Sequence, residues 1–161
     1  MKNLSKKKLI LFDIDYTLFD TDTFKKTKLR KHVLYKEVKE VLEKVSKFAS
    51  LGIFSEGDLD FQKTKLLKTD IKNYFKEDFI HIMIKKDDEM QKIIAKYKDK
   101  MVFLVDDNLD ILYKTKRLSP SIFTVWVKRG KYAKYQKPID GFKSDAVIKT
   151  LQELISIVSA R

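Results

Sequence analysis

Hydrophobic residues recur along this chain in two alternating patterns. Short, continuous apolar runs predict strands that are buried on both faces of a sheet. Between them, apolar residues at spacings of three and four predict amphipathic helices. We expect the strands at residues 9–12, 52–55, 79–84, 101–105, 122–127 and 145–148.

The helices are expected in the segments that separate these strands. They cover residues 36–49, 59–75, the region around 90–97, 108–118 and the C-terminal stretch 151–158. The second is expected to break near Thr69 and Asp70, and Asp87 or Asp88 is expected to cap the start of the third. Strands that are apolar throughout and alternate with helices predict an α/β fold. We expect a Rossmann-like three-layer α/β/α sandwich with a mostly parallel central sheet.

Length and composition narrow the class of protein. The chain has 161 residues, 43% hydrophobic and 36% charged, so we expect one globular domain over residues 1–161. No apolar run approaches the roughly 20 residues of a membrane-spanning helix. The run that follows the basic residues 1–8 is too short for a signal peptide. We therefore expect a cytoplasmic protein with no membrane partner. The absence of cysteine excludes disulfides, thiolate zinc sites and a cysteine nucleophile.

The formal net charge of +12 has two interpretations. One is binding of nucleic acid through its phosphates. The other is a solvated, lysine-rich surface. Only four of the basic residues are arginine, the side chain best suited to bidentate phosphate and base contacts, which favours the second interpretation. An anionic substrate fits either, because positive potential steers anions toward a site.

Polar residues follow four of the predicted strands. Carboxyl ends of parallel strands meet at one edge of a sheet, so these residues are expected to converge. Closely packed acids are costly to bury unless a cation neutralises them, and magnesium suits a site built from oxygen ligands. The alternative, that the acids are helix caps or solvated turn residues, fits two acidic pairs in one sheet less well. The converging residues are Asp13, Asp15, Ser55, Lys85, Lys86, Asp106 and Asp107.

In their order along the chain, these motifs resemble the haloacid dehalogenase superfamily of phosphohydrolases. The first is an apolar strand followed by Asp13-Ile14-Asp15-Tyr16-Thr17-Leu18, and the second is a strand that ends in Ser55. The third is a lysine just ahead of a helix, Lys86 or, less in keeping, Lys85. The fourth is the apolar strand 102–105 followed by Asp106-Asp107, and segments 125–130 and 144–148 also look like that family.

The resemblance implies a role for each matched residue. Asp13 would be the nucleophile that forms an aspartyl-phosphate, and Asp15 the general acid and base. Ser55 would bind a phosphoryl oxygen, and Lys86 would neutralise phosphate and nucleophile. Mg²⁺ would be held by the Asp13 carboxylate, the Asp15 backbone carbonyl, and Asp106 or Asp107. Dehalogenases of the family lack the second aspartate of the first motif, so Asp15 favours hydrolysis of phosphate esters.

The chain leaves little room for the cap domain that many members of the family carry. Residues 20–35 allow only a short basic flap, and residues 56–77 are no longer than a helical crossover. An open site suits a large substrate, such as a phosphoprotein or a nucleic-acid end, or a site closed by a second subunit of a homo-oligomer. The flap is interpreted as a basic lip or as a solvated helix face, through Phe24, Lys25, Lys26, Lys28, Arg30 and Lys31.

Three hypotheses for the function follow. The leading one is a phosphatase for a phosphorylated small molecule or macromolecule. The second is a 3′-phosphatase for nucleic-acid ends, and the third, which nothing in the sequence favours, is a binding module without catalysis. His32 and His81 match none of the motifs and are interpreted as structural residues.

Overall fold

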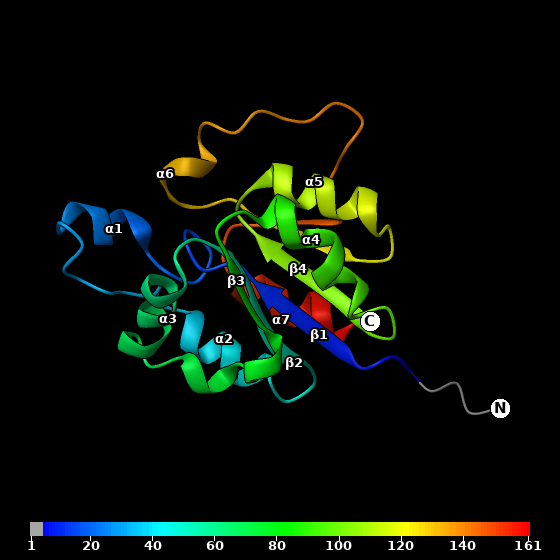
Figure 1. Ribbon diagram of the computed structural model, residues 1–161, viewed down its shortest axis with the longest axis horizontal. Coiled ribbons are helices and arrows are strands. Elements are labelled where there is room, and N and C mark those ends of the chain that lie inside the picture. Colours follow the sequence, from blue (N-terminus) through cyan, green and yellow to red (C-terminus); the bar gives the residue numbers. More distant parts are fainter. Residues whose placement is uncertain (1–4) are drawn as a thin grey trace.

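Six strands form one sheet, and every pair of neighbouring strands runs parallel. This is seen in a computed structural model of the protein, in which residues 5–161 are described (Figure 1). Residues 1–4 of the basic N-terminal stretch lie outside the described part. The strands are β1 (Lys8–Phe12), β2 (Ser50–Glu56), β3 (Ile80–Met83), β4 (Met101–Asp106), β5 (Phe123–Val127) and β6 (Ala146–Ile148).

Helices cover both faces of the sheet, which gives the predicted three layers (Figure 1). The strand order is β3-β2-β1-β4-β5-β6. The helices are α1 (Thr21–Lys26), α2 (Val38–Val45), α3 (Leu59–Lys68), α4 (Lys86–Ala95), α5 (Leu109–Leu118), α6 (Gly130–Ala133) and α7 (Gln152–Ser159), with short 3₁₀ turns at Lys72–Tyr74 and Glu77–Phe79.

Two apolar clusters fill the spaces between the layers. Alternate residues of β1 point to opposite faces, so Ile10 and Phe12 join the cluster under α2 and α7. Leu9 and Leu11 join the cluster under α4 and α5. Residues 9–12 are all buried, as expected for an inner strand covered on both faces. The predicted parallel α/β sandwich is therefore confirmed.

Most predicted helices occur at their expected places. The stretch 59–75 breaks as predicted, because α3 ends at Lys68 and Asp70 adopts a left-handed backbone, with φ of 59°. One prediction was wrong, because neither Asp87 nor Asp88 caps a helix. Helix α4 begins at Lys86, so both acids lie inside its first turn, where they face the positive end of the helix dipole instead.

Two segments stand at the carboxyl-terminal end of the central strands. The basic flap of residues 20–35 contains the short helix α1 and a turn, and the segment after β5 contains α6. Figure 1 shows α1 and α6 on the side to which the arrows of β1 and β4 point. Within residues 5–161, no helix has both the length and the apolar character needed to cross a bilayer.

Candidate active site

Three buried carboxylates meet at the ends of β1 and β4. These strands are neighbours, with Phe12 opposite Val105, so the residues that follow them are brought together. The Asp13 N–H donates to the Val105 carbonyl at 2.9 Å, which extends the pairing by one residue. One carboxylate oxygen each from Asp13, Asp106 and Asp107 lies within 4.8 Å of the other two. The predicted convergence of these acids is therefore present.

Lys86 is the lysine that reaches this acidic cluster. Its Nζ donates to Asp13 Oδ1 at 3.0 Å and to Asp106 Oδ2 at 2.6 Å, and its side chain is buried. Its backbone N–H donates to Glu56 Oε2 at 2.9 Å. Lys85 is exposed at the N-cap position of α4. Of the two lysines, the structure thus brings Lys86 into the acidic cluster, and its role in binding phosphate stays a prediction.

Three carboxyl groups in this cluster share one ammonium group, that of Lys86. Burial, together with the charges of Asp106 and Asp15, raises the pKa of Asp13 to about 7 despite Lys86. Burial and the neighbouring acids Asp13 and Asp106 raise the pKa of Asp107 to about 10. Burial opposes the charged form of Lys86, but Asp106 and Asp13 outweigh it and raise the pKa of this lysine. Such a set of crowded oxygen donors fits a hard divalent cation.

Asp15 lies beside this cluster but has contacts of its own. Its Oδ1 accepts hydrogen bonds from Thr21 Oγ1 at 2.9 Å and from Lys65 Nζ at 2.7 Å. Its Oδ2 accepts a hydrogen bond from Gln62 Nε2 at 2.9 Å. Both carboxylate oxygens are therefore held by donors from α1 and α3, and neither accepts a hydrogen bond from Lys86. The second aspartate of the motif has a separate environment from the first.

Ser55 lies deeper than its expected role requires. It is fully buried on β2, and its Oγ accepts a hydrogen bond from Gln62 Nε2 at 3.0 Å. Ser55 does not line the pocket in front of the acidic cluster, whereas its neighbour Glu56 does. The structure therefore brings Ser55 close to Asp15 through Gln62 and leaves its contact with a phosphoryl oxygen as a prediction.

A pocket of about 190 Å³ opens in front of the acids. Two tyrosines form one side of it, with ring centroids 6.2 Å apart and planes inclined by 26°. Tyr16 comes from the loop after β1, and Tyr132 comes from α6. The Lys25 Nζ donates to the Tyr16 hydroxyl at 3.3 Å, so the flap also reaches this wall. The mouth is thus aromatic and cationic, while its floor is acidic.

Hydrogen bonds attach the α6 segment to the rest of the site. Gln136 Nε2, just after α6, donates to the backbone carbonyl of Asp107 at 2.7 Å, and Trp126 Nε1 from β5 donates to the same carbonyl at 2.9 Å. The Lys131 N–H donates to Asp22 Oδ2 of the flap at 2.8 Å. The segment is therefore fixed to β4 at one end and to α1 at the other, which places Tyr132 at the rim.

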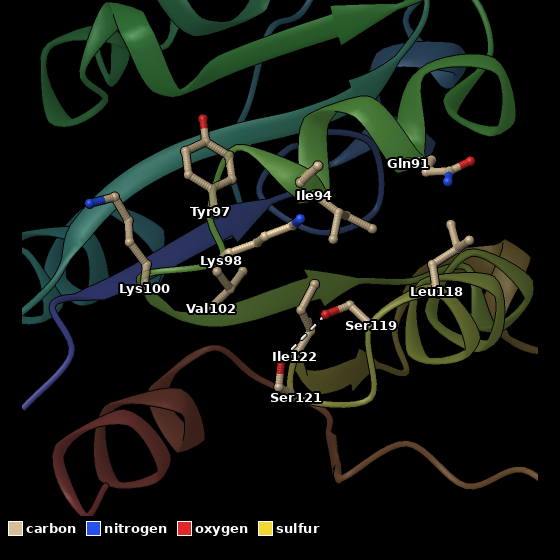
Figure 2. Close-up of a pocket in the computed structure, with 11 residues that line it drawn as sticks. Gln91, Ile94, Tyr97, Lys98, Lys100, Val102, Leu118, Ser119, Ser121 and Ile122 are labelled. Carbon is tan, nitrogen blue, oxygen red and sulfur yellow. Dashed lines mark hydrogen bonds between the residues drawn. The ribbon is translucent and has the colours of Figure 1, made fainter.

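A second hollow, of about 290 Å³, lies at the opposite end of the sheet (Figure 2). It is bordered by the segments that lead into β4 and β5. Lys98, Lys100 and the hydrogen-bonded pair Ser119 and Ser121 are among its lining residues, and none of those lining residues is a carboxylate. The acidic pocket, by contrast, is lined by several carboxylates and Lys86, a set of groups suited to chemistry.

Several residues of the site belong to none of the sequence motifs. Gln62 and Lys65 are three positions apart on α3, within the helix expected over residues 59–75. One sequence feature could have indicated that polar residues of this helix are buried. The apolar residues of 59–68 do not form one stripe along the helix. Tyr132 carried no signal because it lies outside every motif. His32 packs against Phe24, and neither histidine lines the acidic pocket.

Comparisons with known proteins agree with this architecture. A haloacid dehalogenase-like hydrolase from Burkholderia xenovorans is 18% identical, with a TM-score of 0.79 over 96% of this chain and 98% of its own. The chain has the haloacid dehalogenase-like fold. The HAD-hydrolase YfnB from Bacillus subtilis, solved bound to magnesium, is 12% identical, with a TM-score of 0.71 over 96% of this chain and 99% of its own.

A third structure with this fold is named a predicted phosphoglycolate phosphatase, from Haemophilus somnus. It is 14% identical, with a TM-score of 0.70 over 97% of this chain and 100% of its own. No protein-family model and no curated protein matches the sequence. Identities this low show a common fold alone, so the reaction has to be argued from the residues.

Proposed function

We propose that this protein is a magnesium-dependent phosphatase that hydrolyses phosphate monoesters through an aspartyl-phosphate on Asp13. One observation carries the proposal. Asp13 lies in a buried acidic cluster with a single lysine, while Asp15 stands beside it in a separate set of hydrogen bonds. Two carboxylates in different environments suit two different roles, nucleophile and proton carrier.

The reaction has two steps in this proposal. A carboxylate oxygen of Asp13 attacks phosphorus, the bond to the leaving oxygen breaks, and Asp15, which carries a proton before this step, gives that proton to the leaving oxygen. Asp15 then takes a proton from water, whose oxygen attacks the phosphoryl group and releases phosphate and Asp13. Lys86 offsets negative charge at Asp13, and Ser55 is proposed to bind a phosphoryl oxygen.

Magnesium is the cofactor that the donor set fits best. The Asp13 carboxylate, the Asp15 backbone carbonyl, and Asp106 or Asp107 would hold it. When bound, the ion would neutralise the clustered acids and the phosphate. The magnesium bound to YfnB supports this proposal by analogy of fold.

The presence of Asp15 supports phosphatase over dehalogenase chemistry. Cleavage of an alkyl phosphate ester needs a proton for its leaving oxygen, whereas a halide leaves without one. The structure offers a carboxylate for that task, and its two oxygens are already oriented by α1 and α3. This feature favours the phosphatase within the fold.

The experiment is release of phosphate from p-nitrophenyl phosphate. We expect activity that requires Mg²⁺ and that falls by at least about 10³-fold in Asp13→Asn, because the nucleophile is lost. Asp99→Asn is the matched control, since Asp99 is an exposed acid just ahead of β4, at the far end of that strand. Full activity of Asp13→Asn, or of wild type in excess chelator, would contradict the proposal.

A second candidate is a phosphatase for nucleic-acid ends, and the α6 segment favours it. Exposed lysines occur on the flap and on the α6 segment, among them Lys26 on the flap and Lys131 and Lys134 on the α6 segment. Tyr132 and Tyr135 are exposed among them and could stack on bases. Within residues 5–161, none of these three lysines has an acidic partner.

This candidate is tested with a 3′-phosphorylated single-stranded oligonucleotide. We expect the double variant Lys131→Glu, Lys134→Glu to raise KM for the oligonucleotide at least about tenfold and to leave p-nitrophenyl phosphate unaffected, because polyanion binding depends on charge. Lys92→Glu on α4 is the control for a distant charge reversal. Equal KM values for the double variant and wild type would remove this candidate and leave the small-ester phosphatase standing.

A further inference from the structure

Helix α3 buries two polar side chains beside the core residue Leu66 and exposes three apolar ones. Gln62 and Lys65 are only 1% and 4% exposed, whereas Leu59, Phe61 and Leu67 are 47%, 46% and 62% exposed. Folding alone favours the reverse, because lysine is almost never fully buried unless it is paired. Core packing through Leu66 therefore does not by itself explain why Gln62 and Lys65 are buried.

The contacts of the buried pair supply an explanation. The Lys65 ammonium is 2.7 Å from Asp15 Oδ1 and lies 4.8–5.5 Å from the ring centroids of Phe19, Phe24 and Phe61. In Figure 1, α3 and α1 are neighbours, as the packing of Phe24 on Phe61 requires. The aromatic rings exclude water from the lysine stem and leave its charge directed at Asp15.

Gln62 binds the other side of the same carboxylate. Its Nε2 is 2.9 Å from Asp15 Oδ2, 3.0 Å from Ser55 Oγ and 3.2 Å from the Glu56 carbonyl. The last two contacts are on β2, so the amide ties the carboxylate to a rigid strand. Gly57, with φ of 143°, leaves room for this side chain, since an added Cβ would lie 3.0 Å from Gln62 Cγ.

We propose that Lys65 and Gln62 are positioning residues that hold the Asp15 carboxylate in place for proton exchange with the leaving group. The inference rests on the proposed phosphatase function and adds two residues from α3 to it. Proton transfer requires a donor oxygen held close to its target, so a carboxylate free to rotate would lose much of that advantage.

The pair acts on one step of the reaction. Neither side chain hydrogen-bonds to Asp13, Lys86 or Asp106 within the described chain, and only Gln62 also contacts Ser55, so loss of Lys65 leaves the groups for phosphate and metal binding in place. Loss of either residue should therefore resemble a partial loss of Asp15. A general loss of structure would affect every substrate equally.

The test compares two esters with Lys65→Met and Gln62→Met. The leaving group of p-nitrophenyl phosphate departs without a proton, whereas that of an alkyl phosphate needs one. We expect kcat/KM, which covers the steps up to departure of the leaving group, to fall about 10- to 100-fold for the alkyl ester and less than about threefold for the aryl ester. The Mg²⁺ concentration for half-maximal activity should not change.

Matched controls separate this result from other causes. Lys68→Met removes an exposed charge from the same helix and should leave both esters unaffected. In an Asp15→Asn background, Lys65→Met should cause no further loss, because the group it positions is already gone. Methionine can pack among the three rings, and Gln62→Met carries the test if Lys65→Met melts below assay temperature.

The outcomes are distinct. If wild type hydrolyses neither ester, the proposed function fails. If wild type is active but both variants lose equal factors on the two esters, lose nothing, or lose more in the Asp15→Asn background, the inference about Lys65 and Gln62 is overturned.

Discussion

At the scale of single residues, the two adjacent acids after β4 have different surroundings. Asp106 has both oxygens occupied, because Oδ2 accepts from Lys86 Nζ and Oδ1 accepts from the Asn108 N–H. The Asp107 carboxylate faces Asp13 and, within residues 5–161, accepts no hydrogen bond from a nitrogen donor. Asp106 is therefore suited to holding Lys86, and Asp107 is the better candidate for direct metal binding.

This difference makes a prediction about the paired acids. Asp107→Asn should raise the Mg²⁺ concentration needed for half-maximal activity at least about tenfold, since it removes an unshared ligand. Asp106→Asn should mainly lower kcat, because it releases Lys86. Magnesium titrations of p-nitrophenyl phosphate hydrolysis measure both effects. A larger metal defect in Asp106→Asn than in Asp107→Asn would reverse the assignment.

The sequence was sufficient for some of these residues and insufficient for others. Asp13 and Asp106 were predictable because each follows a buried strand, and parallel strands bring their ends together. Lys85 and Lys86 could not be separated, since adjacent helical residues differ by about 100° in direction and the start of α4 was unknown. The burial of Ser55 could not be predicted either, because it depends on the packing of Gln62 against it.

At the scale of elements, α6 meets the loop after β1 at a glycine. Gly130 has φ of 74°, and a Cβ there would lie 2.5 Å from Tyr16 Cδ1. Gly141 has the same φ, but a Cβ added there would meet nothing within 4 Å. Both glycines therefore have a left-handed backbone, and only Gly130 has a neighbour that a side chain would strike. Close approach of α6 to Tyr16 thus depends on Gly130.

The two glycines form a matched pair for substitution. Gly141→Ala should cost about 1 kcal/mol, the strain of a left-handed backbone. Gly130→Ala should cost clearly more and also lower kcat/KM for p-nitrophenyl phosphate severalfold, because Tyr132 and the pocket wall must move. Urea denaturation and the hydrolysis assay measure these effects. Equal losses of stability in the two variants, with full activity in both, would show that the contact with Tyr16 is unimportant.

Helix α3 shows where hydrophobic periodicity fails as a guide to burial. Its existence and its break near Asp70 were predictable from spacing and turn chemistry. The face that it buries was not, because hydrophobic periodicity assumes that apolar residues point inward. Here Leu59 and Leu67 are exposed, while Lys65 is buried and reaches Asp15. The short helix α6 was missed for another reason, since its one turn of helix gives no measurable period.

At the scale of the whole molecule, the parallel sheet was predictable and the strand order was not. Continuous apolar runs indicate burial on both faces, which β1 shows at every position from Leu9 to Phe12. Periodicity contains no information on which strands are neighbours, and the order β3-β2-β1-β4-β5-β6 is what puts β1 and β4 together. The acidic cluster is a consequence of that order.

The raised pKa of Asp107 predicts how the stability of the protein depends on pH and on metal. Burial beside Asp13 and Asp106 raises the pKa of Asp107 to about 10, against 3.8 for an unperturbed aspartate. Between about pH 7.5 and 9 the folded state thus binds a proton that the unfolded state has lost, and stability falls with rising pH, by at most about 1.4 kcal/mol per pH unit for one proton. Without Mg²⁺, Tm should drop by several degrees over this range.

Magnesium should raise Tm more at the upper end of this range than at the lower end, because it replaces the proton. The variant Asp107→Asn should flatten both trends. Thermal melts with and without chelator decide the matter, and a metal-free Tm that stays level or rises with pH across this range would contradict this account of the cluster.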